Sequence, residues 1–310
     1  MGTPHQKAHH ETLACVRLLL ILMLAGCSGA SLGGPCSVAH ACGDGAICDL
    51  TDPDGPTCID AAGDVDGDGI PNGNDFCEHA PGGAHDEDAD GIGDDCDPCP
   101  IAKPPASPDP DGDAVDSPCD PDPHTAGDTI LLFDGFADGL GSNWTPTTPA
   151  SWTVVGGELV VSNIPEQDYL RTNVAEAPHI AIEASYRVDK LETGATTHLV
   201  AVNAHDPRPA GVASLECGVV HADSGAGDVV DLETNQSTSS SPATGSAFDA
   251  ASLYEAAAYD SGNSVGCTVI GDGHGLAAVE AQITPDALPS IALTARAVTA
   301  RFQWVLVVGH

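Results

Sequence analysis

Three runs of aspartate at regular intervals constrain this chain more than any other feature of its sequence. They begin at Asp64, Asp86 and Asp109, so consecutive starting points lie 22 and 23 residues apart. Counted from the first aspartate of each run, oxygen-bearing side chains occupy positions 1, 3, 5, 9 and 12. Because the runs hold almost no apolar residues, they cannot fold by burying an apolar core. If the runs fold, an interaction other than apolar burial must stabilise them.

The spacing of these oxygens fits a hard divalent cation. Ca²⁺ takes six to eight oxygen ligands, and alternate residues of a tightly turning loop can point at one centre. Without a cation, two carboxylates about 6 Å apart repel by about 0.7 kcal/mol even in water. We therefore predict calcium as the cofactor, and we expect its binding to supply much of the folding free energy of this stretch. The predicted ligands are Asp64, Asp66, Asp68, Asn72 and Asp75 in the first run, Asp86, Asp88, Asp90, Asp94 and Asp97 in the second, and Asp109, Asp111, Asp113 and Asp120 in the third.

The runs differ at position 6, where the chain must turn back toward its ligands. Gly69 and Gly91 occupy this position in the first two runs, and glycine adopts a left-handed conformation without steric cost. The third run has Ala114 there and Ser117 at position 9, so we expect its site to be the least regular. The sequence around the runs predicts no amphipathic helix, which argues against an EF-hand. A disordered acidic spacer is the other alternative, and the fixed register argues against it.

Residues 64–122 resemble the thrombospondin type 3 repeat in the spacing of their aspartates and the placement of their cysteines. The segment Cys-Asp-Pro-Cys-Pro at residues 96–100 is similar to the junction between repeats in bacterial members of that family. The resemblance implies calcium ions wrapped by irregular backbone and braced by disulfides, without regular secondary structure. Seven prolines between Lys103 and Pro123 predict that the region ends in a semi-rigid, extended spacer.

The N-terminus predicts export and membrane anchoring. An apolar run at residues 18–25 is too short for a spanning helix, which needs about 20 apolar residues, and is typical of a signal peptide. It ends in Leu-Ala-Gly-Cys at residues 24–27, which resembles the lipobox of bacterial lipoproteins. The resemblance implies cleavage before Cys27, lipidation of Cys27 and a lipid-anchored place in the cell envelope. Ser28 favours the outer membrane if the source has two membranes; plain secretion is the alternative.

Ten further cysteines fall into even clusters of four, four and two. In a chain with an export signal, such clusters predict disulfides. The sequence leaves three connectivities open for the first cluster. Cys96 and Cys99 also have the spacing of a zinc knuckle, but no second such pair follows. The predicted disulfide cysteines are Cys36, Cys42, Cys48 and Cys58, then Cys77, Cys96, Cys99 and Cys119, and finally Cys217 and Cys267, which we expect to bridge each other rather than to remain free thiols.

Aromatic residues place a conventional core in the C-terminal part. Of the 12 Phe, Trp and Tyr residues, only Phe76 precedes Phe133. Residues 179–188 alternate apolar and polar side chains, as in a half-buried strand, and residues 302–308 repeat the pattern. Many such short strands lie between Gly, Asn, Asp and Pro turns, without a convincing helix. The further strand candidates are Ile130–Phe133, Trp152–Val155, Glu158–Val161, Leu199–Ala204, Val212–Val220, Leu253–Tyr259, Val265–Ile270 and Leu276–Ile283. This pattern predicts a β-sandwich, with the Ser/Thr-rich stretch at 235–246 as a mobile surface loop.

The C-terminal part also resembles concanavalin A-like, or laminin G-like, jelly-roll domains. The resemblance rests on Phe-Asp-Gly-Phe at 133–136, Asn-Trp at 143–144, Trp-Thr-Val-Val-Gly-Gly-Glu-Leu at 152–159 and the closing strands at 291–308. It implies a jelly roll and, by analogy, carbohydrate as the candidate ligand. The predicted class is therefore mainly β, a C-terminal jelly-roll β-sandwich preceded by an irregular repeat region stabilised by disulfides and calcium. The predicted domains are a lipoprotein signal peptide at 1–26, a lipidated N-terminus and small Cys-rich module at 27–60, the repeats and Pro-rich spacer at 61–123, and the sandwich at 128–310.

The net charge and the catalytic motifs limit the functions that this chain can have. The chain has 46 acidic and 9 basic side chains and a net charge of −37, which excludes nucleic acid as a natural partner because phosphate binding draws on Lys and Arg. Glycosidases of the concanavalin-like family carry a Glu-x-Asp-x-x-Glu strand, and the nearest match is Asp231-Leu232-Glu233, without a third acid. The histidines of this part have no partner at a diagnostic spacing, so we expect them at the surface or in turns rather than as metal ligands or a catalytic base. They are His198, His205, His221 and His274.

The sequence therefore favours a recognition protein over an enzyme. We expect a lipid-anchored protein whose calcium-binding stalk presents a recognition domain, with calcium, the membrane and possible carbohydrate as its partners. A structural envelope protein without a specific ligand and a divergent glycan hydrolase are the alternatives.

Overall fold

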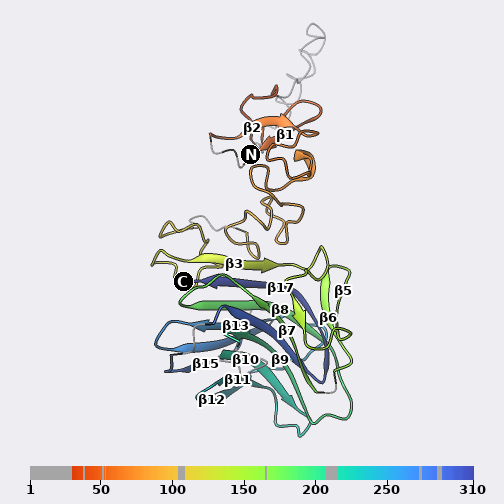
Figure 1. Cartoon of the computed structure of the whole chain (residues 1–310), viewed down its shortest axis with the longest axis vertical. Helices are drawn as coiled ribbons and strands as arrows, with labels where there is room; N and C mark the ends of the chain where they lie inside the picture. Colours follow the sequence, from red (N-terminus) through yellow and green to blue (C-terminus); the bar gives the residue numbers. More distant parts are fainter. Residues whose placement is uncertain are drawn as a thin grey trace, which may run out of the picture. The chain divides into compact units, whose positions relative to one another are not determined.

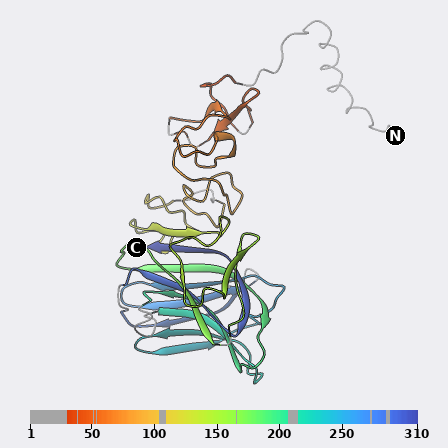
Figure 2. The ribbon, with the colours of Figure 1, turned by 45° about the vertical axis from the view of Figure 1, so that its right-hand side comes forward.

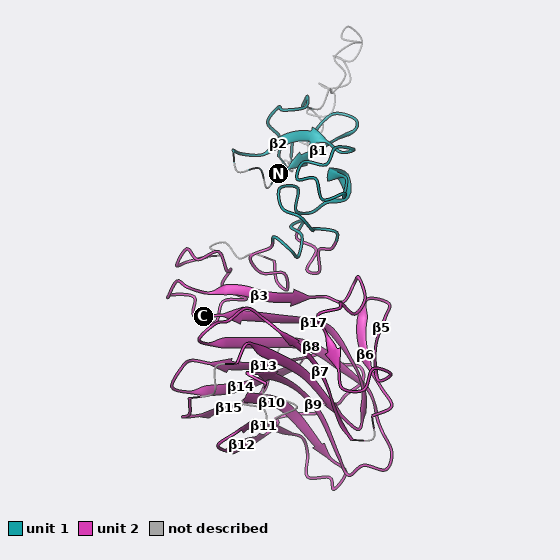
Figure 3. Cartoon of the chain, in the orientation of Figure 1, with its two compact units in different colours: residues 1–84, 91–96 teal, residues 85–90, 97–310 magenta. Residues whose placement is uncertain are grey.

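The computed structural model describes residues 30–310, except 38, 51, 53, 104–108, 165, 207–214, 272–273 and 285–287. The predicted signal peptide at 1–26 and the predicted lipidation site Cys27 lie outside the described residues. The chain forms two compact units, one of residues 1–84 and 91–96 and one of residues 85–90 and 97–310 (Figure 3). The third aspartate run thus belongs to the same unit as the predicted sandwich.

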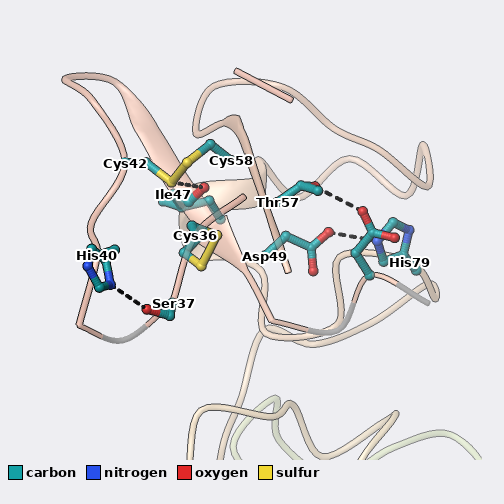
Figure 4. The surroundings of a disulfide bond; sticks show 11 residues. Cys36, Ser37, His40, Cys42, Ile47, Asp49, Thr57, Cys58 and His79 are labelled. Atoms are coloured by element: carbon teal, nitrogen blue, oxygen red, sulfur yellow. Dashed lines mark hydrogen bonds and ion pairs between the residues drawn. A yellow bond between two sulfur atoms is a disulfide. The ribbon is translucent and has the colours of Figure 1, made fainter. Parts of the chain in front are cut away.

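The first unit contains a small disulfide-bonded module. Its only described strands, β1 (Ala46–Asp49) and β2 (Thr57–Asp60), form an antiparallel pair. The disulfides Cys36–Cys48 and Cys42–Cys58 hold this pair, and this pairing answers the connectivity that the sequence leaves open. In Figure 4 the Cys42–Cys58 bridge lies beside the strands, and the His79 ring points at Asp49, with 2.7 Å between Nε2 and Oδ2. These disulfides stabilise a module that is too small to bury a large apolar core.

The rest of the first unit is irregular, as the repeat resemblance implies. Between Asp60 and Ala84 the described backbone contains one short element, the 3-10 turn η1 (Asn72–Asn74). The disulfide Cys77–Cys96 closes this part of the chain, and Cys99–Cys119 closes the corresponding part of the second unit. All four cysteines of the second cluster are therefore paired.

The second unit contains a β-sandwich of two antiparallel sheets, visible from two directions in Figures 1 and 2. The chain passes repeatedly from one sheet to the other, as in a jelly roll. This confirms the predicted mainly β class. The seven-stranded sheet has the order β12 (Thr238–Pro242), β11 (Val229–Thr234), β10 (Leu215–Ala222), β9 (Thr197–Ala204), β16 (Ser290–Arg296), β7 (Gln167–Asn173) and β4 (Thr145–Pro146).

The eight-stranded sheet contains the longest strands, β8 and β17, side by side at its centre. Its core packs aromatic rings: the Tyr186 ring lies 5.5 Å from Tyr254 and 6.3 Å from Phe302, between centroids. The order is β15 (His274–Ala281), β14 (Val265–Gly271), β13 (Tyr254–Asp260), β8 (Ile180–Leu191), β17 (Val298–Gly309), β6 (Glu158–Val161) and β5 (Trp152–Val155), with β3 (Thr129–Asp134) also paired to β17.

A disulfide and alternating side chains join the two sheets. Cys217 of β10 bonds to Cys267 of β14, which confirms the predicted bridge. Apolar side chains of every second residue meet between the sheets, and the intervening residues face outward. Burial of this contiguous core stabilises the sandwich.

The strand β12 contradicts the expectation of a mobile loop at 235–246, and the strand β7 was not predicted from the sequence. Residues 238–242 form β12 at the sheet edge and pair with β11. The polar strand β7 also lacks an apolar signal; its Asp168 is buried and accepts hydrogen bonds from the backbone N–H groups of Thr148 and Tyr169. Pairing with a neighbouring strand, rather than local propensity, fixes both.

A second, smaller apolar cluster lies on the outer face of β17. Val115 and Cys119 of the third aspartate run pack there against Trp304 and Leu306, and all four are buried. The third run therefore shares apolar contacts with the sandwich and does not stand apart from it.

Candidate functional site

The first aspartate run brings three carboxylates together. Asp64, Asp66 and Asp68 offer oxygen atoms that all lie within 4.8 Å of one another. Backbone N–H groups position them: Gly67 and Gly69 donate to the two oxygens of Asp64, at 2.7 and 3.1 Å. The backbone of the loop thus folds around the three aspartates that were predicted from their spacing.

Two left-handed residues give each run its turn. At position 6, Gly69 and Gly91 have φ of 101°, as the sequence predicts, and Ala114 takes the same region with φ of 75°. Position 4 is left-handed as well, with φ of 82° at Gly67 and 59° at Ala89, and sequence analysis missed this position. The alanines accept a conformation that costs an L-residue about 1–2 kcal/mol, so the turn is imposed by the rest of the loop.

The third run repeats the geometry of the first, although its sequence is the least regular. Asp109, Asp111 and Asp113 again offer oxygens within 4.8 Å of one another. Asp109 accepts hydrogen bonds from the N–H groups of Gly112 and Ala114, at 2.7 and 3.0 Å, as Asp64 does in the first run. The substitution of alanine for glycine therefore leaves the ligand arrangement intact.

The second run has its own cluster in the second unit. Asp86, Asp88 and Asp90 offer oxygens within 4.8 Å of one another. Burial, and then the charges of Asp90, Asp88 and Asp116, raise the pKa of Asp97 to about 7. Asp116, which sequence analysis missed, is buried with 6% of its surface exposed.

Several buried carboxylate oxygens in the runs have no hydrogen-bond partner among the described residues. They are one oxygen each of Asp66, Asp88 and Asp120, and both oxygens of Asp111. Burial raises the pKa of Asp75, Asp88, Asp111 and Asp120, and neighbouring aspartates raise it further, for Asp120 to about 6. Buried, unpaired carboxylates are costly unless a cation neutralises them. The donor set consists of hard oxygen ligands, which fits Ca²⁺.

Two other predicted ligands, Asn72 and Asp94, lie outside the three-carboxylate clusters. The Asn72 amide braces the backbone, because its Oδ1 accepts from Val65 N–H and its Nδ2 donates to the Asp60 carbonyl. Asp94 lies in the first unit and is half-buried. The zinc alternative for Cys96 and Cys99 is removed, since each is in a disulfide.

The outer face of the seven-stranded sheet is the second candidate site. One row across it runs Glu233, Glu216, Asn203, Ala292 and Arg171, in directly paired positions on β11, β10, β9, β16 and β7. Charged groups thus lie at both ends of the row and a polar amide at its centre.

The Arg171 end of this row is fixed. The Arg171 guanidinium lies 5.0 Å from the centroid of the Tyr169 ring, and its Nε donates to Asp206 at 3.0 Å. In the middle of the face, Asn203 Nδ2 donates to Thr294 Oγ1 at 2.7 Å, and Asn203 Oδ1 has no partner among the residues described. An aromatic ring, a guanidinium and an amide therefore share this face.

The acidic end contains three carboxyl groups from two strands. Glu216 and Glu233 are direct cross-strand partners on one face, and Asp231 lies two residues from Glu233. Burial, followed by the Glu233 charge, raises the pKa of Asp231. The sequence motif finds Asp231 and Glu233 but misses Glu216, since only the register of β10 against β11 brings Glu216 to them.

The described histidine side chains have structural partners. His198 hydrogen-bonds the Ala297 carbonyl at 2.7 Å, and His205 hydrogen-bonds the Leu288 carbonyl at 3.0 Å. His221 pairs with Asp228 at 2.6 Å. The side chain of His274 lies outside the described residues. The expectation of surface or turn histidines is wrong for His198 and His205, because both are buried, with 1% and 0% of their surface exposed, and His198 lies within β9.

A cavity of about 360 Å³ lies in the second unit between residues 118–122 and the outer face of the eight-stranded sheet. Apolar residues of β8, β13 and β17 form much of its wall, and Glu183, Asp260 and His310 contribute polar groups. Burial and then the Glu255 charge raise the pKa of Glu183 to about 7.

A comparison with protein-family models finds no match, and a comparison with curated proteins finds none. Similar solved structures include the CBM2 module of the evolved Dit of Lactobacillus casei BL23 phage J-1, peanut lectin with a nine-residue peptide, and a Bacillus licheniformis β-glucanase. Their identities are 9%, 12% and 14% and their TM-scores 0.43, 0.40 and 0.40. The matches cover 58%, 59% and 56% of this chain and 95%, 97% and 96% of those chains. Because these TM-scores lie below 0.5, the sheets described above, and not these similarities, establish the sandwich.

Among the described residues, no helix has the length and apolar character that a membrane crossing requires.

Proposed function

We propose that this chain is a lipid-anchored protein of the cell envelope, in which calcium-binding aspartate runs carry a β-sandwich that recognises carbohydrate. The observation that carries the proposal is the set of buried carboxylate oxygens that lack hydrogen-bond partners among the described residues of the runs. The same geometry occurs in the first and third runs, which differ in sequence at position 6. A recurring arrangement of this kind favours a ligand over chance crowding of acids.

Calcium is the cation that the runs fit best. Each cluster offers only oxygen atoms, and calcium accepts irregular arrangements of six to eight oxygens, whereas Mg²⁺ demands a near-ideal octahedron. Bound calcium would neutralise the clustered charge and thereby supply folding free energy to a region with few apolar residues.

Calcium binding is tested by native mass spectrometry of the mature chain during a calcium titration. We expect several calcium ions per chain, and Asp66→Asn to remove one of them, because this carboxylate has an unpartnered oxygen. Asp54→Asn, an exposed aspartate outside the runs, is the matched control and should leave the number unchanged. A chain that takes up no calcium at millimolar concentration would refute this part of the proposal.

The lipid anchor is supported by the Leu-Ala-Gly-Cys segment that follows the apolar run. Replacing Cys27 by Ser should release the protein from the membrane fraction and abolish its labelling by palmitate. Cys15→Ser, in the predicted signal peptide, is the control. Continued labelling of the Cys27 variant would contradict lipid attachment at this residue.

Carbohydrate recognition is supported by the outer face of the seven-stranded sheet. Binding sites combine apolar or aromatic surface with a few placed polar groups, and this face presents the partly exposed Tyr169 and Arg171, with the buried Asn203 in the same row as Arg171. On a glycan array we expect the mature chain to bind at least one glycan class, with the signal lost in Arg171→Ala. Arg187→Ala, an arginine on the other sheet, is the control. An empty array would favour a structural envelope protein.

The cross-strand pair Glu216 and Glu233 supports a second candidate, a divergent glycan hydrolase. Directly opposite residues of antiparallel strands have Cβ atoms about 4.5–5.5 Å apart, and retaining glycosidases need carboxyl groups about 5–5.5 Å apart. If the chain hydrolyses soluble β-glucans, Glu216→Gln and Glu233→Gln should each abolish turnover, and the exposed Glu176→Gln should not. Turnover that survives in both variants would place the activity elsewhere.

A further inference from the structure

Asp128, which belongs to none of the predicted aspartate runs, has a buried carboxyl group with unsatisfied oxygens. It directly precedes β3, only 2% of its surface is exposed, and both of its carboxylate oxygens lack a hydrogen-bond partner within the described part of the chain. The His310 ring lies near it, with Nδ1 3.9 Å from Oδ1, beyond hydrogen-bond distance. A buried carboxylate without a hydrogen-bond donor is expensive to ionise.

The carboxyl group of Asp128 points into the third run. It lies against the carboxyl group of Asp120, and Asp111 and Asp113 are among the other nearby charges. The backbone of Asp128 is fixed there, because its N–H donates to Asp113 Oδ2 at 2.7 Å. Unpartnered oxygens of Asp111, Asp120 and Asp128 therefore come from three separate places in the chain.

The first run shows that this orientation follows from the fold of the loop. Gly82 N–H donates to Asp68 just as Gly127 N–H donates to Asp113, at 2.8 and 2.9 Å. The residue after Gly82 is Gly83, and a Cβ placed on Gly83 would lie 2.5 Å from Asp75 Oδ1. The same Cβ would lie 2.5 Å from the Cys77 nitrogen, so this position of the first run lies beside the carboxylate of position 12 but leaves no room for a side chain. The third run carries an aspartate there, where the first run carries glycine.

We propose that Asp128 is a ligand of a divalent cation bound by the third run, together with Asp111 and Asp120. This inference rests on the proposed calcium binding and adds a ligand from outside the runs. Six to eight oxygens suit calcium, and Asp128 supplies oxygens to the run whose position 9 is serine.

The position of Asp128 couples this site to the sandwich. Asp128 continues directly into β3, which pairs with the central strand β17 from Asp134↔Val305 to Thr129↔Gly309. Val115 and Cys119 of the same run pack against side chains of β17. A cation held by Asp111, Asp120 and Asp128 therefore favours the folded sandwich, because a ligand that binds only the native state stabilises it.

The test measures the thermal unfolding of the mature chain by tryptophan fluorescence, with calcium and with EDTA. Calcium should raise the unfolding midpoint of the wild type. Asp128→Asn should lose this rise, bind one calcium fewer in native mass spectrometry, and unfold in EDTA at the wild-type midpoint or above it, because the amide removes a buried charge. Asp122→Asn, an exposed neighbour with the same change of charge, should keep the wild-type response.

Two further outcomes keep the inference separate from the proposed function. If the wild type binds calcium but Asp128→Asn has the same number of ions and the same midpoints, Asp128 is no ligand, and the runs still bind calcium. If the wild type binds none, calcium binding itself fails, and the assignment of Asp128 fails with it. Should Asp128→Asn not fold, Asp111→Asn serves in its place, and Asp66→Asn in the first unit should lower the number of ions without moving the sandwich midpoint.

Discussion

The aspartate runs and the β-sandwich differ in the kind of side chain that they bury. The sandwich buries a contiguous set of apolar side chains between two sheets, so its cohesion comes from water exclusion. The runs bury carboxylates instead, and several of their oxygens have no partner among the described residues. The comparison teaches that apolar burial can account for the cohesion of the sandwich but not for that of the runs, for which we propose bound cations.

Chelation of calcium should produce the largest difference between the two regions, because we expect it to loosen the runs and leave the sandwich folded. With EDTA, repulsion among the carboxylates should open the first run and expose Cys77–Cys96, while Cys217–Cys267 stays inside the sandwich. Alkylation after limited reduction, followed by peptide mass spectrometry, should show Cys77 modified at least about tenfold faster in EDTA than in calcium. Equal rates in both conditions would mean that no cation holds the first unit.

Removing an aromatic ring from the core should destabilise the sandwich and leave the first aspartate run unaffected. Phe302 is fully buried, and Phe302→Ala should cost the sandwich about 3–5 kcal/mol, measured by urea unfolding in calcium. Calcium uptake by the first run should stay as it is, because Asp64, Asp66 and Asp68 lie in the other unit. Val155→Ala, at an exposed position, is the control and should change stability by less than about 0.5 kcal/mol. A similar loss from both variants would contradict the core assignment.

Burial of an acid in the sandwich should make its stability depend on pH. Glu183 has a folded-state pKa of about 7, above the ordinary 4.5, so the folded state holds this proton more tightly than the unfolded chain. The stabilisation is present below pH 4.5 and is lost as pH rises through 7. Since the side chain is half-buried and its charge partly screened, we expect Glu183→Gln to gain about 1 kcal/mol at pH 8 and nothing at pH 4.

Thermal unfolding at the two pH values checks this prediction, with Glu176→Gln as the exposed control. An equal gain at pH 4 and pH 8 would show that packing, and not ionisation, is responsible.

The smallest effect concerns the left-handed alanine of the third run. Ala114 has φ of 75°, so Ala114→Gly should relieve strain and stabilise the calcium-loaded second unit by about 0.5–1 kcal/mol. Ala150→Gly, at an exposed turn without a positive φ, should bring no gain. Differential unfolding in calcium compares the two variants, and a loss of stability in Ala114→Gly would argue that the loop does not impose the turn.

Local pattern explains what the sequence could predict. The strands at Trp152–Val155 and Glu158–Val161 have the predicted bounds because their side chains alternate or their flanking turns are marked by glycine. The clustering of three carboxylates in each run could be predicted from spacing, because these aspartates lie close in sequence. The bridge Cys217–Cys267 followed from two separate predicted strands.

Long-range pairing explains what the sequence could not predict. Glu216 faces Glu233 only through strand register, and Asp116 and Asp128 reach the aspartate clusters from outside the repeating positions. The polar strand β12 exists because β11 offers it a partner. None of these residues carries a local signal, so only the fold brings them to their sites.

The central claim is that cations hold the aspartate runs while apolar burial holds the sandwich. Hydrogen exchange with peptide-resolved mass spectrometry, in calcium and in EDTA, compares both regions of one sample. We predict that amides of the runs, including Gly67, Gly69 and Gly112, are protected in calcium and exchange at unfolded-chain rates in EDTA, while β8 remains protected in both. Equal protection of the runs with and without calcium would contradict the claim.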